Sequence, residues 1–366
     1  MRIHILRGWR SRLTFAVLLC LCLHACVGGK KKTLAPSPPQ RAFYYWRTTF
    51  HLSEAEIHAL ADLNIERLYV RLLDVDRESG DAAPRPVGQL TGLDATSLSR
   101  LEVVPVIYLR NRALRGLDAH ATGRLADQIW QESQRTMARL GTKWREIQLD
   151  CDWNETTRET FFALLTNLAP HTKLRKLSLS TTIRLHQVKY RERTGVPPVD
   201  RGMLMFYNMG PIDADSDTQA IFDAAHARPY LGRLHEYPLP LDVALPIWSW
   251  VVQVRDDRVM GLLQNTDRDA LVGKTWLQAR GENRFEVMES AFLNGALLRQ
   301  GDLLHIEGGR AATSQAAADL AAAHMGTEGQ LTGHGPRGTV ALFDLSEKNL
   351  AHHDTPSLAR LFAAFR

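Results

Sequence analysis

The sequence predicts a single α/β domain over residues 42–366, a (β/α)8 TIM barrel, on two observations. Eight runs rich in β-branched, aromatic and leucine residues recur along the chain, and helical patterns separate the early ones. Strands that alternate with helices form a parallel sheet, and eight parallel strands close into a barrel without free edges. An open doubly wound sheet is the alternative. No Gly-x-Gly-x-x-Gly motif follows the first strand, so a dinucleotide-binding domain has no support.

The eight predicted strands are bounded by turn residues or by helical patterns. In chain order they are Phe43–Thr49, Arg67–Leu73, Val103–Leu109, Glu146–Trp153, Lys176–Ile183, Met203–Asn208, Val243–Trp250 and Thr339–Leu345.

Helix start and stop signals lie between these strands. Residues Ser53–Glu56 and Thr156–Glu159 both fit a capping box, which predicts helices that run to Leu63 and Leu168. A third segment, from Asp118 to Leu140, has amphipathic spacing and is followed by Gly141, a typical C-cap residue.

About ninety residues separate the seventh strand from the eighth, far more than an ordinary connection. We expect an insertion over 251–337 on the C-terminal face of the barrel, where active sites are built. It begins with a predicted hairpin, Val251–Val254 and Val259–Leu263, and continues with two predicted helices, Arg284–Arg299 and Ser314–His324. We interpret it as a lid or a binding wall. A packing elaboration without contact to a ligand is the alternative.

The amino terminus has the pattern of a secretory signal, predicted over residues 1–25. Basic residues precede an apolar stretch, Leu13–Leu23, that is too short to span a bilayer. The run Leu-His-Ala-Cys that ends at Cys26 resembles the lipobox of bacterial lipoproteins, in which the cysteine is lipidated with acyl chains such as palmitate. An ordinary secretory signal is the alternative.

A Lys-, Gly- and Pro-containing stretch, 26–41, then predicts a tether. The resemblance to lipoproteins implies a lipid anchor in the bacterial cell envelope. Because Val27 rather than Asp follows the cysteine, it implies the outer membrane, facing the periplasm or the cell surface.

The distribution of charge excludes a nucleic-acid partner. The formal net charge is +5, but residues 1–40 contain seven basic side chains and no acidic ones. That leaves 38 basic and 40 acidic side chains in residues 41–366, so the folded part lacks the basic surface that nucleic acids require.

Cysteine and histidine usage predicts neither a metal nor another cofactor. With the signal removed and Cys26 lipidated, Cys151 alone remains in the folded part, which excludes an internal disulfide and a cysteine-based zinc site. His186, His352 and His353 lack a ligand spacing, so we interpret them as surface residues.

The strongest chemical signal ends the fourth strand, in the run Asp-Cys-Asp-Trp-Asn-Glu of residues 150–155. Strand alternation predicts that Asp150, Asp152 and Asn154 share one side, toward the barrel interior or its mouth. If both aspartates are partly buried, their mutual repulsion raises one pKa, as general acid–base chemistry requires. In the alternative, barrel arginines neutralise these aspartates and the group fills a polar layer, the candidates being Arg47, Arg71 and Arg184.

This segment resembles the strand-four motif of glycoside hydrolase family 18, the chitinase-type enzymes, which reads Asp-x-x-Asp-x-Asp-x-Glu. Asp150 and Asp152 match the second and third aspartates, whereas Ile147 and Asn154 occupy the positions of the first aspartate and the acidic glutamate. The segment Met-Phe-Tyr-Asn, residues 205–208, is similar to a second family segment. By that resemblance, Tyr207 and Asn208 hold the N-acetyl group of a substrate.

Because Asn154 replaces the family's acidic glutamate, the resemblance does not decide whether this protein is an enzyme. An amide cannot donate the proton that the family's glutamate gives to the glycosidic oxygen. Glu155 is adjacent, but the strand period points it to the other side unless the backbone turns. One hypothesis is a divergent glycosidase in which Asp150, Asp152 and Glu155 are the catalytic candidates. The second is a glycan-binding protein without catalysis, with Asn154 among its ligand contacts. The third is a catalytically inactive structural or assembly lipoprotein that contacts a protein partner.

Aromatic and polar side chains at the strand ends complete the predicted site. A floor on which sugar rings stack is predicted from Tyr45, Trp46, Tyr108, Tyr207, Trp248 and Trp250. Polar residues at or just past the ends of strands two, three and five are Arg71, Asp74, Arg110, Arg184, His186 and Gln187. We include Arg71 among the glycan contacts. For any single aromatic residue, packing in the core is the alternative.

Overall fold

The computed structural model describes residues 38–77, 83–92, 98, 100–208, 210, 212, 214, 219–264, 266–325 and 338–365. The predicted signal peptide, the lipidation site at Cys26 and most of the predicted tether lie outside these residues.

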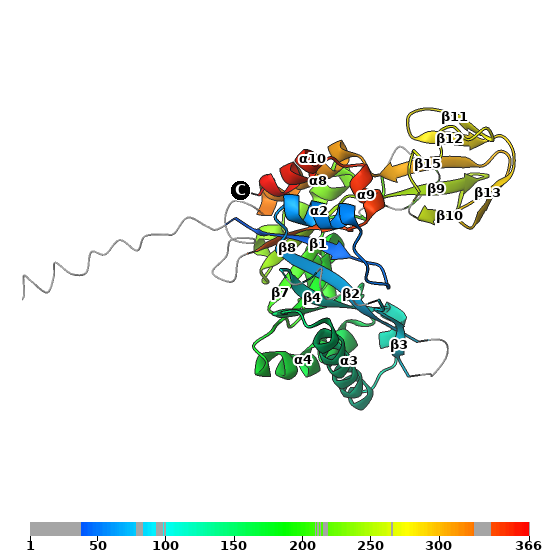
Figure 1. Ribbon diagram of the computed structural model, residues 1–366. Helices are drawn as coiled ribbons and strands as arrows, with labels where there is room; N and C mark the ends of the chain where they lie inside the picture. Colours follow the sequence, from blue (N-terminus) through cyan, green and yellow to red (C-terminus); the bar gives the residue numbers. More distant parts are fainter. Residues whose placement is uncertain are drawn as a thin grey trace, which may run out of the picture. The chain divides into compact units, whose positions relative to one another are not determined.

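Eight parallel strands form a closed barrel, which confirms the predicted fold (Figure 1). The first strand pairs in parallel both with the second and with the last, and this closes the ring. Each predicted strand overlaps one strand of the barrel. In order they are β1 (Gln40–Tyr45), β2 (Arg67–Asp76), β4 (Glu102–Leu109), β5 (Glu146–Cys151), β6 (Ser178–Arg184), β7 (Arg201–Met205), β8 (Leu241–Pro246) and β16 (Thr339–Phe343). One strand that was not predicted, β3 (Arg85–Gln89), pairs antiparallel with β2.

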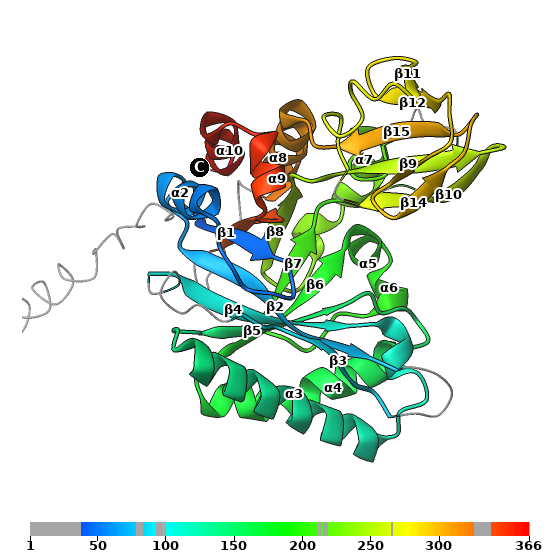
Figure 2. The same cartoon turned by 45° about the vertical axis from the view of Figure 1, so that its right-hand side comes forward.

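The three predicted helices form on the outside of this barrel, two of them with the predicted caps. Helix α2 (Glu54–Asp62) has the full capping box at Ser53 and Glu56. Helix α3 (Ala119–Leu140) ends at Gly141, whose φ of 63° is the left-handed conformation of a C-cap. Helix α4 (Arg158–Leu174) runs beyond the predicted end at Leu168 and lacks the predicted capping box, because its N-cap side chain makes no capping hydrogen bond. Figure 2 shows α3 and α4 side by side.

Shorter helical elements lie mainly in the connections after the strands. They are η2 (Asn111–Leu114), α5 (Leu185–Lys189), α6 (Arg191–Thr194), α7 (Ala224–Leu231), η3 (Leu234–Glu236), α9 (Glu347–Ala351) and α10 (Thr355–Ala363). Among the described residues, no helix combines the length and the apolar character needed to cross a bilayer.

The insertion between β8 and β16 forms its own antiparallel sheet (Figure 2). The predicted hairpin is confirmed by β9 (Ser249–Arg255) and β10 (Arg258–Gln264). The other strands are β11 (Leu277–Ala279), β12 (Arg284–Val287) and β15 (Leu303–Gly308), with a separate hairpin of β13 (Ala291–Leu293) and β14 (Ala296–Leu298). Buried residues such as Val251, Phe285 and Leu304 give this sheet a separate apolar core.

Of the two helices predicted in the insertion, one is confirmed and the other is wrong. Helix α8 (Ala311–Met325) contains the predicted segment Ser314–His324. The predicted helix Arg284–Arg299 is replaced by β12, β13 and β14. Asn294 and Gly295, with φ of 47° and 81°, form the turn between β13 and β14. An Asn-Gly pair is a strong hairpin signal, and here it outweighed the helical pattern.

A buried network of charges fills the amino-terminal end of the barrel interior. The Nη1 of Arg67 lies 2.9 Å from Oε2 of Glu146, and the Nη2 of Arg201 lies 2.6 Å from Oδ1 of Asp242. All four side chains are less than a tenth exposed. Each buried charge therefore has an opposite partner, as burial in a protein interior requires.

Candidate functional site

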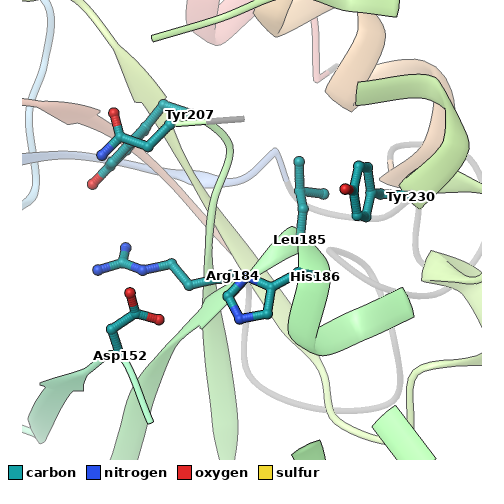
Figure 3. Close-up of a pocket in the computed structure, with 7 residues that line it drawn as sticks. Asp152, Arg184, Leu185, His186, Tyr207 and Tyr230 are labelled. Carbon is teal, nitrogen blue, oxygen red and sulfur yellow. The ribbon is translucent and has the colours of Figure 1, made fainter. Parts of the chain in front are cut away.

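The carboxyl ends of β5, β6 and β7 surround a cavity of about 270 Å³ (Figure 3). It is lined by Asp152, Arg184, Leu185, His186, Tyr207, Asn208 and Tyr230. A second cavity of about 430 Å³ shares Asp152 and Arg184 with the first, so the two are adjacent. Its other lining residues are Tyr108, Leu109, Arg110, Asn111 and Arg112. This is the face of a TIM barrel on which ligands bind.

The two aspartates of the strand-four motif occupy different environments. Asp150 is buried, and its Oδ1 accepts hydrogen bonds from Oγ1 of Thr182 at 2.6 Å and from Nη2 of Arg184 at 3.4 Å. Asp152 is exposed and lines both cavities. The predicted rise in the pKa of one aspartate requires that both be partly buried. Because Asp152 is exposed, this condition is not met.

Only one of the three arginines proposed as partners reaches this motif. Arg184 pairs with Asp150, whereas Arg47 pairs with Glu56 and Arg71 with Asp74. Figure 3 shows the carboxylate of Asp152 facing the guanidinium of Arg184. Burial lowers the pKa of Arg184, but the negative charges of Asp150 and Asp152 outweigh it and hold the pKa above its usual value. The side chain thus stays positively charged in the mouth.

Tyr207 and Asn208 lie just past the end of β7 and line the first cavity. The Tyr207 hydroxyl donates to the sulfur of Met205 at 3.2 Å, and burial raises the pKa of this tyrosine well above its usual value. The side chain of Asn208 is exposed, and its φ of 54° is left-handed. Its N–H donates to the carbonyl of Ile221 at 2.8 Å, which fixes the turn that presents this residue.

Five aromatic rings form a connected cluster at the mouth, which we call the aromatic floor: Trp46, Tyr108, Tyr207, Trp248 and Phe343. The ring of Phe343 lies 5.2 Å from Trp46, 5.2 Å from Trp248 and 5.5 Å from Tyr207. Tyr207 meets Trp248 edge to face at 4.6 Å. Trp46, Tyr108 and Phe343 remain half-buried, so part of the floor is accessible.

Arg71 lies over this floor. Its guanidinium carbon is 5.3 Å from the ring centre of Trp46 and 5.5 Å from that of Tyr108. These are cation–π distances, and they place Arg71 at the mouth together with the aromatic rings. Its pairing with Asp74 holds the side chain in that position.

Two of the predicted site residues at the end of strand four lie away from the cavities. Asn154 accepts hydrogen bonds at Oδ1 from the N–H of Thr156 at 3.0 Å and from its hydroxyl at 2.7 Å. Glu155 is exposed and pairs with Arg193 at 2.5 Å. Strand β5 ends at Cys151, so the alternation that placed Asn154 beside Asp152 no longer applies there.

Two predicted aromatic residues also lie elsewhere. Tyr45 is fully buried on the opposite side of β1 from Tyr44, packs on Phe50 at 4.7 Å and donates to the carbonyl of Thr49. Trp250 belongs to β9 of the inserted sheet, where its Nε1 donates to Glu307 at 2.8 Å. Strand β8 ends at Pro246, so Trp248 and Trp250 do not continue the barrel strand as predicted. Trp248 nevertheless reaches the floor.

Sequence reasoning did not single out three residues that shape the mouth. Tyr230 lines the first cavity from α7, Arg112 lines the second from η2, and Phe343 joins the floor from the end of β16. Phe343 had a signal, since it lies near the end of the last predicted strand, Thr339–Leu345. Tyr230 and Arg112 lie in connections whose path the sequence pattern does not specify.

His186 lines the first cavity without a metal-binding partner set. Burial is the main cause that lowers its pKa; Arg184 acts in the same direction and Asp152 opposes it. The imidazole is therefore neutral at neutral pH. Among the described residues, no group of three or more His, Cys, Asp or Glu side chains is arranged to hold a metal ion.

Comparison with known proteins identifies the class of fold. No protein-family model matches the sequence, and no curated protein matches it. Among solved structures, the chain is similar to a chitinase from Chromobacterium violaceum ATCC 12472, with 13% identity, a TM-score of 0.55, and coverage of 90% of this chain and 100% of the other.

Two further structures agree. The C-terminal domain of a putative chitinase from Desulfitobacterium hafniense DCB-2 has 9% identity and a TM-score of 0.56, with 90% of this chain and 100% of that one covered. The spore cortex-lytic enzyme SleL of Bacillus megaterium QM B1551 has 12% identity and a TM-score of 0.55, with 90% and 75% covered. The chain therefore has the (β/α)8 TIM barrel fold that these three structures share.

Proposed function

We propose that this protein is a lipid-anchored envelope protein whose barrel binds a glycan containing N-acetylhexosamine. The observation that carries the proposal is the cavity at the ends of β5, β6 and β7, which Asp152, Arg184, Tyr207 and Asn208 line together. Charged and amide groups provide hydrogen-bond donors and acceptors for hydroxyl and acetamido groups. The half-buried rings of the aromatic floor provide surfaces for the apolar faces of sugar rings.

Binding without cleavage is the form of this function that the geometry favours. In the chitinase-type motif the acid is a glutamate, whereas the matching Asn154 has no proton to give and its side chain is occupied at the start of α4. Glu155 is paired with Arg193 outside the cavities. Asp150 accepts from a hydroxyl and a guanidinium and lines neither of the two described cavities, so its carboxylate is not presented to a glycan there.

One observation favours hydrolysis as a second candidate. Asp152 is an exposed carboxyl that lines both cavities, so it is within reach of a bound glycan. In this version protonated Asp152 gives its proton to the glycosidic oxygen, the bond from that oxygen to the anomeric carbon breaks, and a water molecule bonds to that carbon and returns a proton to Asp152. The alternative from another class is a structural or assembly lipoprotein whose barrel mouth contacts a protein partner.

The binding experiment uses the full chain, purified in detergent. Calorimetry with N,N′,N″-triacetylchitotriose is compared for the wild type, Asp152→Asn, Tyr230→Ala and a control, Asp62→Asn, whose exposed carboxyl lies at the end of α2. Loss of one hydrogen bond to a charged group weakens binding by about tenfold or more. We expect that loss for Asp152→Asn, a weaker affinity for Tyr230→Ala and no change for the control.

The same samples decide between the candidates. Release of new reducing ends that is abolished in Asp152→Asn establishes the hydrolytic version. Absence of binding to a panel of chitooligosaccharides and peptidoglycan fragments contradicts the glycan function and leaves the structural alternative.

The lipid anchor has its own test. Cells fed an alkyne analogue of palmitate should label the wild-type chain, and Cys26→Ser should remove the label and release the protein from the outer-membrane fraction. Labelling that persists in Cys26→Ser overturns this part of the proposal.

A further inference from the structure

We propose that the glycan bound at the mouth is anionic, and that its negatively charged group lies in the second cavity against Arg110 and Arg112. This inference rests on the proposed function and specifies its ligand class. The second cavity is the larger of the two, at about 430 Å³, and is lined by three arginines, Arg110, Arg112 and Arg184, and by one carboxylate, Asp152.

A buried carboxylate, that of Asp76, pairs with both Arg110 and Arg112. Asp76 is 6% exposed, and its Oδ1 and Oδ2 accept from Nε and Nη2 of Arg112 at 2.6 and 2.5 Å. The Nε of Arg110 lies 3.2 Å from Oδ2 of the same residue. The hydrogen bonds from Arg112 are the main cause that keeps the pKa of Asp76 below its usual value, so this anchor is ionised at neutral pH.

The pairing leaves donors unused on the solvent side. The side chains of Arg110 and Arg112 are 50% and 54% exposed, whereas that of Asp76 is 8% exposed. One buried acid thus serves two guanidinium groups, each of which carries five N–H donors. The donors that do not face Asp76 form a cationic wall of the cavity, and guanidinium groups bind carboxylate, sulfate or phosphate oxygens.

Nearby carboxylates restrict where the anion can lie. Asp150 is buried against Arg184, and Asp74 pairs with Arg71, so both already have a cation. Asp152 is exposed and lines both cavities, so its carboxylate lies where the two cavities meet. Figure 3 shows it facing Arg184. A ligand anion is therefore repelled from that boundary and attracted to Arg110 and Arg112. A neutral acetamido sugar fits the first cavity beside Tyr207 and Asn208.

The test compares disaccharides that differ by one substituent. Chitobiose is neutral, N-acetylglucosaminyl-N-acetylmuramic acid adds a lactyl carboxylate, and 6-O-sulfated chitobiose adds a sulfate ester. Calorimetry with the full chain at low salt should give about tenfold tighter binding for at least one anionic sugar than for chitobiose. The sugar that gains affinity identifies whether the group is a carboxylate or a sulfate.

Variants assign the gain to the arginines. Arg110→Gln and Arg112→Gln should each reduce the anionic advantage to about twofold or less and affect chitobiose affinity much less, since one hydrogen bond to a charge is worth about a factor of ten and chitobiose carries no charge. Arg112→Lys retains the charge and should keep part of the advantage. Arg135→Gln is the control, because this arginine is 68% exposed on α3 and pairs with Glu132. Removal of Arg112 could impair folding, because Arg112 is the closer partner of the buried Asp76. Arg110 lies farther from Asp76, so Arg110→Gln tests the same cavity with less risk to the fold.

Each outcome has one meaning. Chitobiose binding as tight as that of both anionic sugars overturns the anionic ligand while the glycan function stands. An anionic advantage that persists in both glutamine variants places the anion elsewhere and overturns the assignment. Failure of all three sugars to bind contradicts the glycan function and this inference with it.

Discussion

The guanidinium of Arg184 lies 3.4 Å from the buried carboxylate of Asp150 and also faces the exposed carboxylate of Asp152, two residues further along the chain. The two aspartates therefore have separate tasks. Asp150 neutralises and orients Arg184 below the mouth, and Asp152 remains available to a ligand.

Substitution of Asp150 should mainly affect stability, and substitution of Asp152 should mainly affect binding. Asp150→Asn removes the counter-charge of a largely buried arginine and should lower the free energy of unfolding by about 2–4 kcal/mol. Asp152→Asn removes an exposed charge and should change it by about 0.5 kcal/mol or less, while weakening glycan affinity. Urea unfolding followed by tryptophan fluorescence measures both. Equal losses of stability would show that the two carboxylates act as one buried pair.

Asn154→Ala should separate the structural role of this residue from any ligand role. The substitution removes the oxygen that accepts from the N–H and hydroxyl of Thr156, and loss of such an acceptor at a helix start costs about 1 kcal/mol. Glycan affinity should stay unchanged, because Asn154 does not line either described cavity. Thermal melts and calorimetry on the same sample check both statements. A tenfold loss of affinity would return Asn154 to the site.

The sequence predicted the barrel because strand and helix patterns are local. Alternation, capping residues and turn glycines each act over a few residues, and the capping box at Ser53 and the cap at Gly141 formed as expected. The error in the insertion was also local, since Asn294 and Gly295 carried a turn signal that the helical spacing of the flanking residues obscured.

The sequence predicted those residues of the candidate site that lie at strand ends, but not those that lie in connections. Asp152, Tyr207 and Asn208 lie just past the ends of strands, and they line one cavity. Which of several arginines pairs with Asp150 is set by contacts across β5 and β6, and no spacing in the sequence encodes that choice. Tyr230 and Arg112 come from connections, whose paths depend on tertiary packing.

Asp344 gives the stability of the protein a specific pH dependence. It follows β16, and burial raises its pKa to about 6, although hydrogen bonds to its carboxylate, including the one that Nδ2 of Asn349 donates to Oδ1, act in the opposite direction. The folded state therefore holds this proton more tightly than the unfolded state, whose pKa is near 3.8. Stability should fall as the pH rises from about 4 to about 6 and then stay level with respect to this group.

Asp344→Asn is the matching variant, because it imitates the protonated carboxyl and keeps an oxygen that can accept from Asn349. It should raise the free energy of unfolding by about 1–3 kcal/mol at pH 8 and leave it unchanged at pH 3.5. Urea titrations at the two pH values measure the difference. A gain of equal size at both would mean that the carboxyl has the same pKa in both states.

Two glycines of the insertion, Gly308 and Gly301, differ in the space around them. Comparing alanine substitutions at the two positions tests whether the insertion influences the barrel mouth. Gly308 has a φ of 72°, and a Cβ there would lie 2.3 Å from the carbonyl oxygen of Trp248. Gly301 has a φ of 87° and no atom within 4 Å of the same position. Alanine at Gly301 carries only the left-handed backbone cost of about 1–2 kcal/mol. Alanine at Gly308 adds an overlap that costs about 1–3 kcal/mol more.

The overlap at Gly308 also acts on the aromatic floor. Trp248 accepts from the N–H of Gly309 at 2.9 Å and contacts Tyr207 at 4.6 Å, so moving its backbone displaces a ring of the floor. Gly308→Ala should therefore weaken glycan binding as well as stability, whereas Gly301→Ala should reduce stability alone. Calorimetry at a temperature where both variants remain folded separates the two effects. Unchanged affinity in Gly308→Ala would mean that the inserted sheet does not influence the mouth through Trp248.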